Sequence, residues 1–78
     1  MGTPPLRRKP ARKTLLTARE IEVLRGVANG KSASAIGGIL QITKRTVDEH
    51  VHAAVRKLGA LNRTHAVAIA MRDNIIKL

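Results

Sequence analysis

Apolar residues recur along the chain with the period of an amphipathic helix, in segments separated by short polar or glycine-containing turns. The first such segment is predicted to begin after Thr17, which can cap the helix while Glu20, three residues later, completes a capping box. Leu16 and Ile21 stand at the two positions whose side chains pack together across a helix start of this kind. Asn29-Gly30 is the expected end of this helix.

A second, shorter helix is expected over about residues 33–40, with Ser32 as its N-cap. It contains Gly37 and Gly38, and glycine is costly inside a helix. The two glycines indicate either the close approach of another stretch of backbone or a weak, frayed helix. The sequence leaves both interpretations open.

A third helix is expected over residues 44–58, between Thr43 as the N-cap and Gly59 as the stop. One continuous apolar stripe runs along it: Val47, Val51, Ala54, Val55 and Leu58. The opposite side is polar and carries charge of both signs: Arg45, Asp48, Glu49, His52 and Arg56. Such a helix buries one side and offers the other to a partner, although a helix side that merely faces water has the same pattern.

A fourth helix is expected from about Arg63 to Asp73, capped by Asn62. With no strand signal in the sequence, the prediction is an all-α fold, a four-helix bundle. Within it, a short helix, a turn at residues 41–43 and a longer helix form a helix-turn-helix pattern. That motif places its second helix, here residues 44–58, in the major groove of DNA.

Charge and composition favour a nucleic-acid partner and narrow its kind. The 78 residues include 15 Lys and Arg against 5 Asp and Glu, a net charge of +10. The chain has no Phe, Trp or Tyr, so it lacks the aromatic side chains on which single-stranded nucleic acids stack. A duplex is therefore favoured over a single strand as the ligand.

The basic residues are divided between two regions of different character. Residues 1–14 contain all three prolines, five basic residues and no acidic residue, so half of the net charge lies there. We expect this segment to be a basic tail or linker that does not fold, and residues 15–78 to be the single folded domain.

Other classes of function find little support in the sequence. No apolar run approaches the roughly 18 residues that a membrane span needs, and no secretory signal is apparent, so a cytoplasmic, nucleoid-associated protein without a membrane partner is expected. His50 and His52, two residues apart on a helix, cannot share a metal ion, and the chain has no cysteine. Neither an enzyme nor a metal or other cofactor is predicted.

Many residues at fixed offsets resemble the LuxR-type helix-turn-helix domain, which is shared with the FixJ and NarL response regulators. The resemblance covers about residues 15–76 and rests on these strings: Leu16-Thr17-x-Arg19-Glu20-x-Glu22-Val23-Leu24, Ala28-x-Gly30-Lys31-Ser32, Leu40-x-Ile42-Thr43-x-x-Thr46-Val47-x-x-His50, Arg56-Lys57-Leu58-Gly59 and Asn62-Arg63-Thr64-x-Ala66-Val67-Ala68. Residues 44–50 look more like the autoinducer-binding, quorum-sensing branch of the family than the response regulators.

The resemblance implies a bacterial transcription factor of the winged-helix-like superfamily, without a wing, whose DNA-binding domain follows a sensor domain. Base-facing positions match Asp48, Glu49 and His52. Backbone-facing positions match Lys31, Ser32, Lys44, Arg45, Thr46 and Lys57, and Arg56 lies on the same exposed side of the helix. Val67 and Met71 match a homodimer interface on the fourth helix, where core packing is the alternative, and the sensor domain is a second means of dimerisation. RNA polymerase is a further expected partner.

The same resemblance implies that Glu20, Glu22 and Arg63 form ion pairs within the scaffold. Asp48 departs from the family, which often has Lys at this position. A carboxylate beside phosphates is repulsive unless it accepts a hydrogen bond from cytosine N4 or from a basic side chain. We therefore expect Asp48 and Glu49 to set sequence preference partly by rejecting wrong bases. The alternative is an ion pair within the helix, with Arg45 or His52.

A rival prediction of a different class is a small basic RNA- or ribosome-associated structural protein. In that case residues 1–14 would be an arm that penetrates RNA, and binding would not depend on a duplex sequence. Sequence-dependent affinity for a palindromic duplex separates the two.

Overall fold

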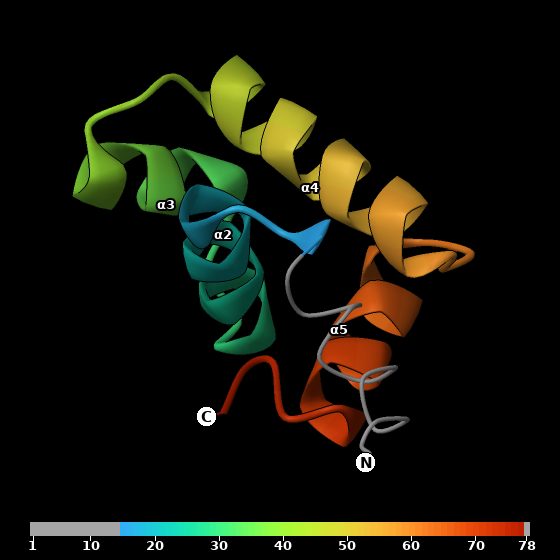
Figure 1. Cartoon of the computed structure of the whole chain (residues 1–78). Coiled ribbons are helices and arrows are strands. Elements are labelled where there is room, and N and C mark those ends of the chain that lie inside the picture. Colours follow the sequence, from blue (N-terminus) through green and yellow to red (C-terminus); the bar gives the residue numbers. More distant parts are fainter. Residues whose placement is uncertain (1–14, 78) are drawn as a thin grey trace, which may run out of the picture.

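Four helices make up the described part of the chain, residues 15–77 of the computed structural model. They are α2 (Ala18–Ala28), α3 (Ala33–Leu40), α4 (Lys44–Leu58) and α5 (Arg63–Arg72), shown in Figure 1. The predicted all-α, helix-turn-helix architecture is confirmed, and α5 ends one residue earlier than expected. The expected tail, residues 1–14, lies outside the described residues. None of the helices within 15–77 is long and apolar enough to cross a membrane.

Each helix begins directly after the residue that was predicted to cap it. At α2 the capping box is complete: Thr17 Oγ1 accepts a hydrogen bond from the Glu20 N–H, and Glu20 Oε1 accepts one from the Thr17 N–H, both at 3.0 Å. The side chains of Ser32, Thr43 and Asn62 likewise accept the N–H three residues ahead. These bonds satisfy donors that a helix start otherwise leaves unpaired.

Each helix is also followed by a residue in the left-handed conformation: Gly30, Gln41, Gly59 and Asn74. The last of these turns was not predicted from the sequence. After Asn74 (φ 58°) the chain turns back, and the Ile75 N–H donates to the Ala70 carbonyl at 2.7 Å. This turn carries Ile75 and Ile76 into the core, where they are 6% and 2% exposed.

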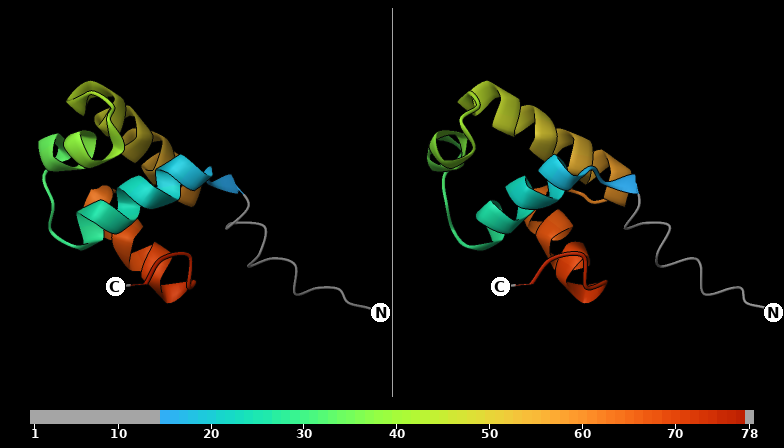
Figure 2. Two further views of the ribbon diagram at one scale, coloured as in Figure 1. Left: turned by 90° about the vertical axis from the view of Figure 1, so that its left-hand side faces the viewer. Right: turned by 60° about the vertical axis from the view of Figure 1, so that its left-hand side comes forward.

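Helix α4 contacts each of the other three helices, whereas α3 and α5 do not contact each other. Figure 1 and both views in Figure 2 place α3 near the start of α4 and α5 near its end. Two clusters of buried side chains follow from this arrangement. One joins α2, α3 and the first half of α4: Val23, Ile36, Val47 and Val51. The other joins α2, the second half of α4, α5 and the C-terminal turn: Leu16, Leu24, Ala54, Leu58, Ala66, Ile69, Ala70, Ile75 and Ile76.

Gly37 and Gly38 turn out to have different surroundings. A Cβ placed on Gly37 would lie 2.7 Å from the carbonyl oxygen of Ile42, whereas one on Gly38 would meet nothing within 4 Å. The Ile42 N–H also donates to the Gly37 carbonyl at 2.9 Å. Of the two open interpretations, the close approach of another backbone is therefore correct for Gly37. It packs the turn at residues 41–43 directly against α3 and so fixes where α4 begins.

Candidate nucleic-acid interface

Helix α4 divides into a buried side and an exposed polar side, as its sequence predicted. Val47, Val51, Ala54 and Leu58 are buried, and Val55 is half-buried. We call the opposite side the α4 face; it consists of Lys44, Arg45, Asp48, Glu49, His52 and Arg56. All of these are exposed except Asp48, which is half-buried. The α4 face thus brings together the three predicted base-facing side chains and three of the predicted basic ones.

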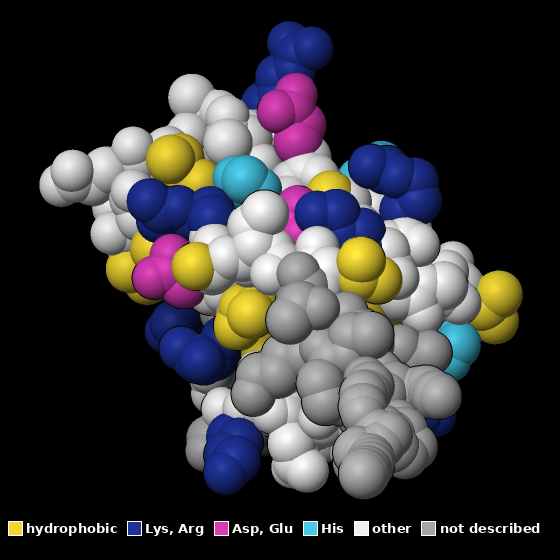
Figure 3. All heavy atoms as spheres, viewed as in Figure 1, with side chains coloured by type: hydrophobic (Ala, Val, Ile, Leu, Met, Phe, Trp, Pro, Cys, Tyr) yellow, Lys and Arg dark blue, Asp and Glu magenta, His cyan; other side chains and the backbone are white. Residues whose placement is uncertain are grey.

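Two ion pairs lie along the first half of the α4 face. Lys44 Nζ is 3.0 Å from Asp48 Oδ2, and Arg45 Nε is 3.6 Å from Glu49 Oε2. The alternative expectation, an ion pair within the helix with Arg45 or His52, is confirmed for Glu49, which pairs with Arg45. Asp48 pairs with Lys44 instead, one turn earlier. Figure 3 shows an acidic side chain directly beside basic ones at the end of the molecule where α4 begins.

These two pairs stabilise the helix little. They are exposed to solvent, and exposed i,i+4 pairs contribute about 0.3–0.5 kcal/mol. In both, the basic residue precedes the acidic one, which is the less favourable order on a helix. Helix stability therefore does not explain why two carboxylates occur at these positions. Lys44 and Arg45 can leave them for other partners at a small cost in free energy.

Three of the remaining predicted backbone contacts, Lys31, Ser32 and Thr46, lie at helix starts. Lys31 and Ser32 are exposed just before α3, and Ser32 Oγ accepts the Ala35 N–H at 3.1 Å. At the start of α4, Thr46 accepts a hydrogen bond at 2.9 Å from the Thr43 hydroxyl. Both helix starts thus point polar groups outward at positions where a phosphate can bind.

Lys57, predicted to contact the DNA backbone, is held by the scaffold. Its Nζ lies 2.9 and 3.1 Å from the two carboxylate oxygens of Glu20, which is the one buried charged residue among those described. Burial raises the pKa of Glu20. The hydrogen bonds from Lys57 and Thr17 and the charges of Lys57 and His50 outweigh burial and hold this pKa below 4.5. The pair ties the last turn of α4 to the first turn of α2.

Of the other two predicted scaffold ion pairs, one is present and one is not. Glu22 pairs with Arg19 at 3.2 Å. The expectation for Arg63 is wrong, because no ion pair joins it to any other residue within 15–77, and its side chain is exposed. The sequence contains a sign that Arg63 forms no ion pair within its helix, because none of the residues three or four positions from it is acidic.

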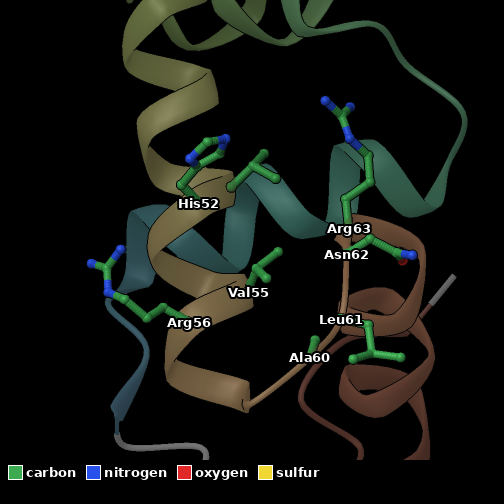
Figure 4. A pocket seen from close by; sticks show the side chains of 8 residues that line it. His52, Val55, Arg56, Ala60, Leu61, Asn62 and Arg63 are labelled. Atoms are coloured by element: carbon green, nitrogen blue, oxygen red, sulfur yellow. The ribbon is translucent and has the colours of Figure 1, made fainter.

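Arg63 instead lines an open groove of about 590 Å³ beside α4. The groove is formed by Val51, His52, Val55, Arg56, Ala60, Leu61, Asn62 and Arg63. Figure 4 shows His52 and Arg63 on opposite sides of the opening, with Val55 below both of them in this view. Leu61, which the sequence did not single out, is 85% exposed at its rim.

The two residues predicted to form a dimer interface differ in burial. Val67 is half-buried against the core, whereas Met71, one turn later, is 39% exposed. Thr64 and Ala68 on the same helix are exposed. Core packing therefore accounts for the partial burial of the Val67 side chain. Met71 is the large apolar side chain that α5 exposes at its surface.

Comparison with known proteins places this chain among bacterial regulators. The family described as "Bacterial regulatory proteins, luxR family" matches residues 14–70. The transcriptional activator protein BjaR1 of Bradyrhizobium diazoefficiens is 58% identical over 67 residues, which are 86% of this chain and 28% of BjaR1. The HTH-type quorum sensing-dependent transcriptional regulator RpaR of Rhodopseudomonas palustris is 51% identical over 72 residues, 92% of this chain and 30% of RpaR. The chain thus spans about three tenths of the length of these relatives.

Proposed function

Because this chain belongs to the luxR family of bacterial regulatory proteins, we propose that it is the DNA-binding domain of a transcriptional regulator, with α4 as the recognition helix in the major groove of double-stranded DNA. The observation that carries the proposal is the α4 face, an exposed polar side on a helix whose opposite side is anchored to all three other helices. A rigid helix with outward polar side chains suits the groove, because base edges are recognised by groups held in fixed positions.

In this proposal the α4 face combines two kinds of contact. Asp48, Glu49 and His52 meet base edges. Lys44, Arg45, Thr46, Arg56 and Lys57, with Lys31 and Ser32 at the start of α3, meet the phosphates that fix the register of the helix on the duplex. Lys57 must leave Glu20 to do so, and we therefore expect it to contribute less than the exposed cations.

The ion pairs on the α4 face suggest how wrong sequences are rejected. Away from DNA, Asp48 and Glu49 neutralise Lys44 and Arg45. On DNA, Lys44 and Arg45 pair with the phosphates, and the two carboxylates then face the bases without these partners. They are stabilised where a cytosine N4 donates a hydrogen bond, and they are repelled where acceptors face them. Both carboxylates thus weaken binding to most DNA sequences and leave binding to a few sequences unweakened.

We propose further that the domain acts as a homodimer on a two-fold DNA site, with recognition helices in major grooves about 10 base pairs apart. Met71 supplies an exposed apolar contact on α5, beside the partly buried Val67. A sensor domain in the rest of the protein is the second means of dimerisation, and RpaR, a quorum sensing-dependent regulator, suggests a quorum-sensing signal as its input. RNA polymerase is the further partner that we propose.

The proposal is tested by selecting binding sites from random duplexes with the 78-residue chain, and then measuring affinities for the selected site and a panel of single-base variants. Asp48→Asn removes one carboxylate charge from the α4 face and keeps the size of the side chain. Glu22→Gln is the matched control, because Glu22 is also ion-paired at the surface but belongs to α2. Both variants change the net charge by +1.

We expect Asp48→Asn to strengthen binding to random duplexes and to reduce the preference for the selected site, since one good base contact discriminates by about 1–3 kcal/mol. Glu22→Gln should leave the preference unchanged. If Asp48→Asn shifts affinity equally for every duplex, Asp48 does not read sequence. If the chain itself binds all duplexes equally, or prefers a folded RNA hairpin, the proposed function is wrong.

A further inference from the structure

The groove between α4 and the turn into α5, here called the Arg63 groove, has no role in the function proposed so far. Its walls come from two segments: Val51, His52, Val55 and Arg56 from α4, and residues 60–63 from the turn and the first residue of α5. His52 and Arg56 belong to both the groove and the α4 face. Anything bound in the groove therefore lies directly beside whatever the recognition helix contacts.

The lining of the Arg63 groove is cationic and apolar. It includes two arginines and a histidine but no Asp or Glu. Val51, Val55, Ala60 and Leu61 supply apolar surface. In Figure 4 the Arg63 guanidinium and the His52 ring lie on opposite sides of the groove, above Val55, whereas Arg56 points away along the outer edge of α4. A ligand that fits carries an anionic group next to a less polar part.

Three of the six arginines within residues 15–77 form ion pairs, and Arg63 is not one of them. Arg19, Arg45 and Arg72 pair with Glu22, Glu49 and Asp73 respectively. Arg63 has no carboxylate partner within residues 15–77 although it is exposed. Its guanidinium therefore keeps its full hydrogen-bonding capacity for an outside acceptor, and guanidinium groups suit phosphate well.

We infer that the Arg63 groove binds the sugar-phosphate backbone of the same DNA duplex whose major groove receives α4. The inference rests on the proposed function. Arg63 holds a phosphate, while Val55 and Leu61 pack against the adjoining deoxyribose. Lys31 and Ser32 at the start of α3 are expected to hold the backbone elsewhere, since α3 and α5 do not contact each other. Arg63 would thus add a second backbone anchor and orient the recognition helix in the groove.

The test compares Arg63→Gln with Arg25→Gln in the 78-residue chain. Arg25 is likewise exposed and has no ion pair within residues 15–77, but it lies on α2. Both variants remove one positive charge. Affinity for the selected duplex and for a scrambled duplex is measured over a series of salt concentrations, and a third variant, Arg63→Lys, restores the charge.

Loss of one phosphate contact reduces the slope of log affinity against log salt by about 0.9, equivalent to about fivefold weaker binding at 0.15 M salt. We expect this for Arg63→Gln on both duplexes, with the ratio of their affinities unchanged. Arg63→Lys should restore most of the slope, and Arg25→Gln should retain it.

Equal slopes for Arg63→Gln and the original chain would overturn the inference while leaving the proposed function standing, provided the original chain still prefers its selected site. Equal slope losses in Arg63→Gln and Arg25→Gln would also overturn it, because the effect would then be one of net charge alone. A preference of the original chain for folded RNA over any duplex would overturn the proposed function itself.

Discussion

Gly37 and Gly38 offer a matched test of how tightly the turn at residues 41–43 packs against α3. Gly37→Ala places a methyl group 2.7 Å from the Ile42 carbonyl oxygen, a backbone atom that cannot rotate away. Gly38→Ala places the same group in open space. Both glycines lie in the same helix, so the two variants differ only in what the added methyl group meets. We expect them to change stability in opposite directions.

The magnitudes follow from two opposing effects. Replacing Gly by Ala inside a helix gains about 1 kcal/mol at either position. At Gly37 the added methyl group must push the turn aside, and forced backbone shifts of this kind cost about 1–3 kcal/mol. The shift also strains the 2.9 Å hydrogen bond from the Ile42 N–H to the Gly37 carbonyl. We expect Gly37→Ala to lower the free energy of unfolding by about 1 kcal/mol and Gly38→Ala to raise it by about as much.

Thermal unfolding followed by far-UV circular dichroism measures the difference, since the chain has no Trp or Tyr for fluorescence. In a domain of this size, about 2 kcal/mol between the two variants corresponds to melting temperatures about 8–16 °C apart. A Gly37→Ala protein that melts at or above the temperature of the original chain would refute the close approach. If instead Gly38→Ala were destabilised as strongly as Gly37→Ala, the Ile42 carbonyl would not be the cause.

Three further predictions concern the packing of α2, the C-terminal turn and α5. Glu20→Gln should lower the free energy of unfolding by about 2 kcal/mol at pH 7, because the Lys57 ammonium loses its charged partner. The pKa of Glu20 is lowered by folding, so this stabilisation is present above about pH 4.5 and fades as the pH falls below it; urea unfolding that shows the same deficit at pH 3 as at pH 7 would contradict it. Ile76→Ala should cost about 2–4 kcal/mol in the same assay, since Ile76 is 2% exposed, and a change under 0.5 kcal/mol would mean that the C-terminal turn does not pack on the core. Met71→Lys should weaken self-association in sedimentation experiments on DNA-bound protein without changing the melting temperature of the free chain, and an unchanged dimer would remove α5 from the proposed interface.

Much of the fold follows from signals that act within a few residues. Thr17, Ser32, Thr43 and Asn62 cap helices because their side chains reach an N–H three residues ahead, and that distance is set by helix geometry alone. The apolar stripe of α4 likewise follows from the helical period and predicts which side is buried. These local rules were sufficient to predict the four helices and the helix-turn-helix arrangement.

The candidate site was predicted less completely, because side-chain partners depend on which surfaces meet. The α4 face was expected, but Asp48 pairs with Lys44 and not with Arg45 or His52. On a helix several basic residues lie within reach of one carboxylate, and small differences in side-chain geometry select the partner. The sequence also suggested an ion pair for Arg63, whereas folding leaves it beside the Arg63 groove with no acidic side chain in the lining.

By itself, the sequence determined the helices, their caps, the exposed side of α4 and membership of a family, because each depends on spacing along the chain. Only the tertiary structure decided that Lys57 reaches Glu20 across 37 residues, that Gly37 and not Gly38 is closely approached, and that Ile75 and Ile76 complete the core. These contacts join elements whose relative positions result from the packing of all four helices at once. No local pattern encodes that packing, so it emerges only when the whole chain has folded.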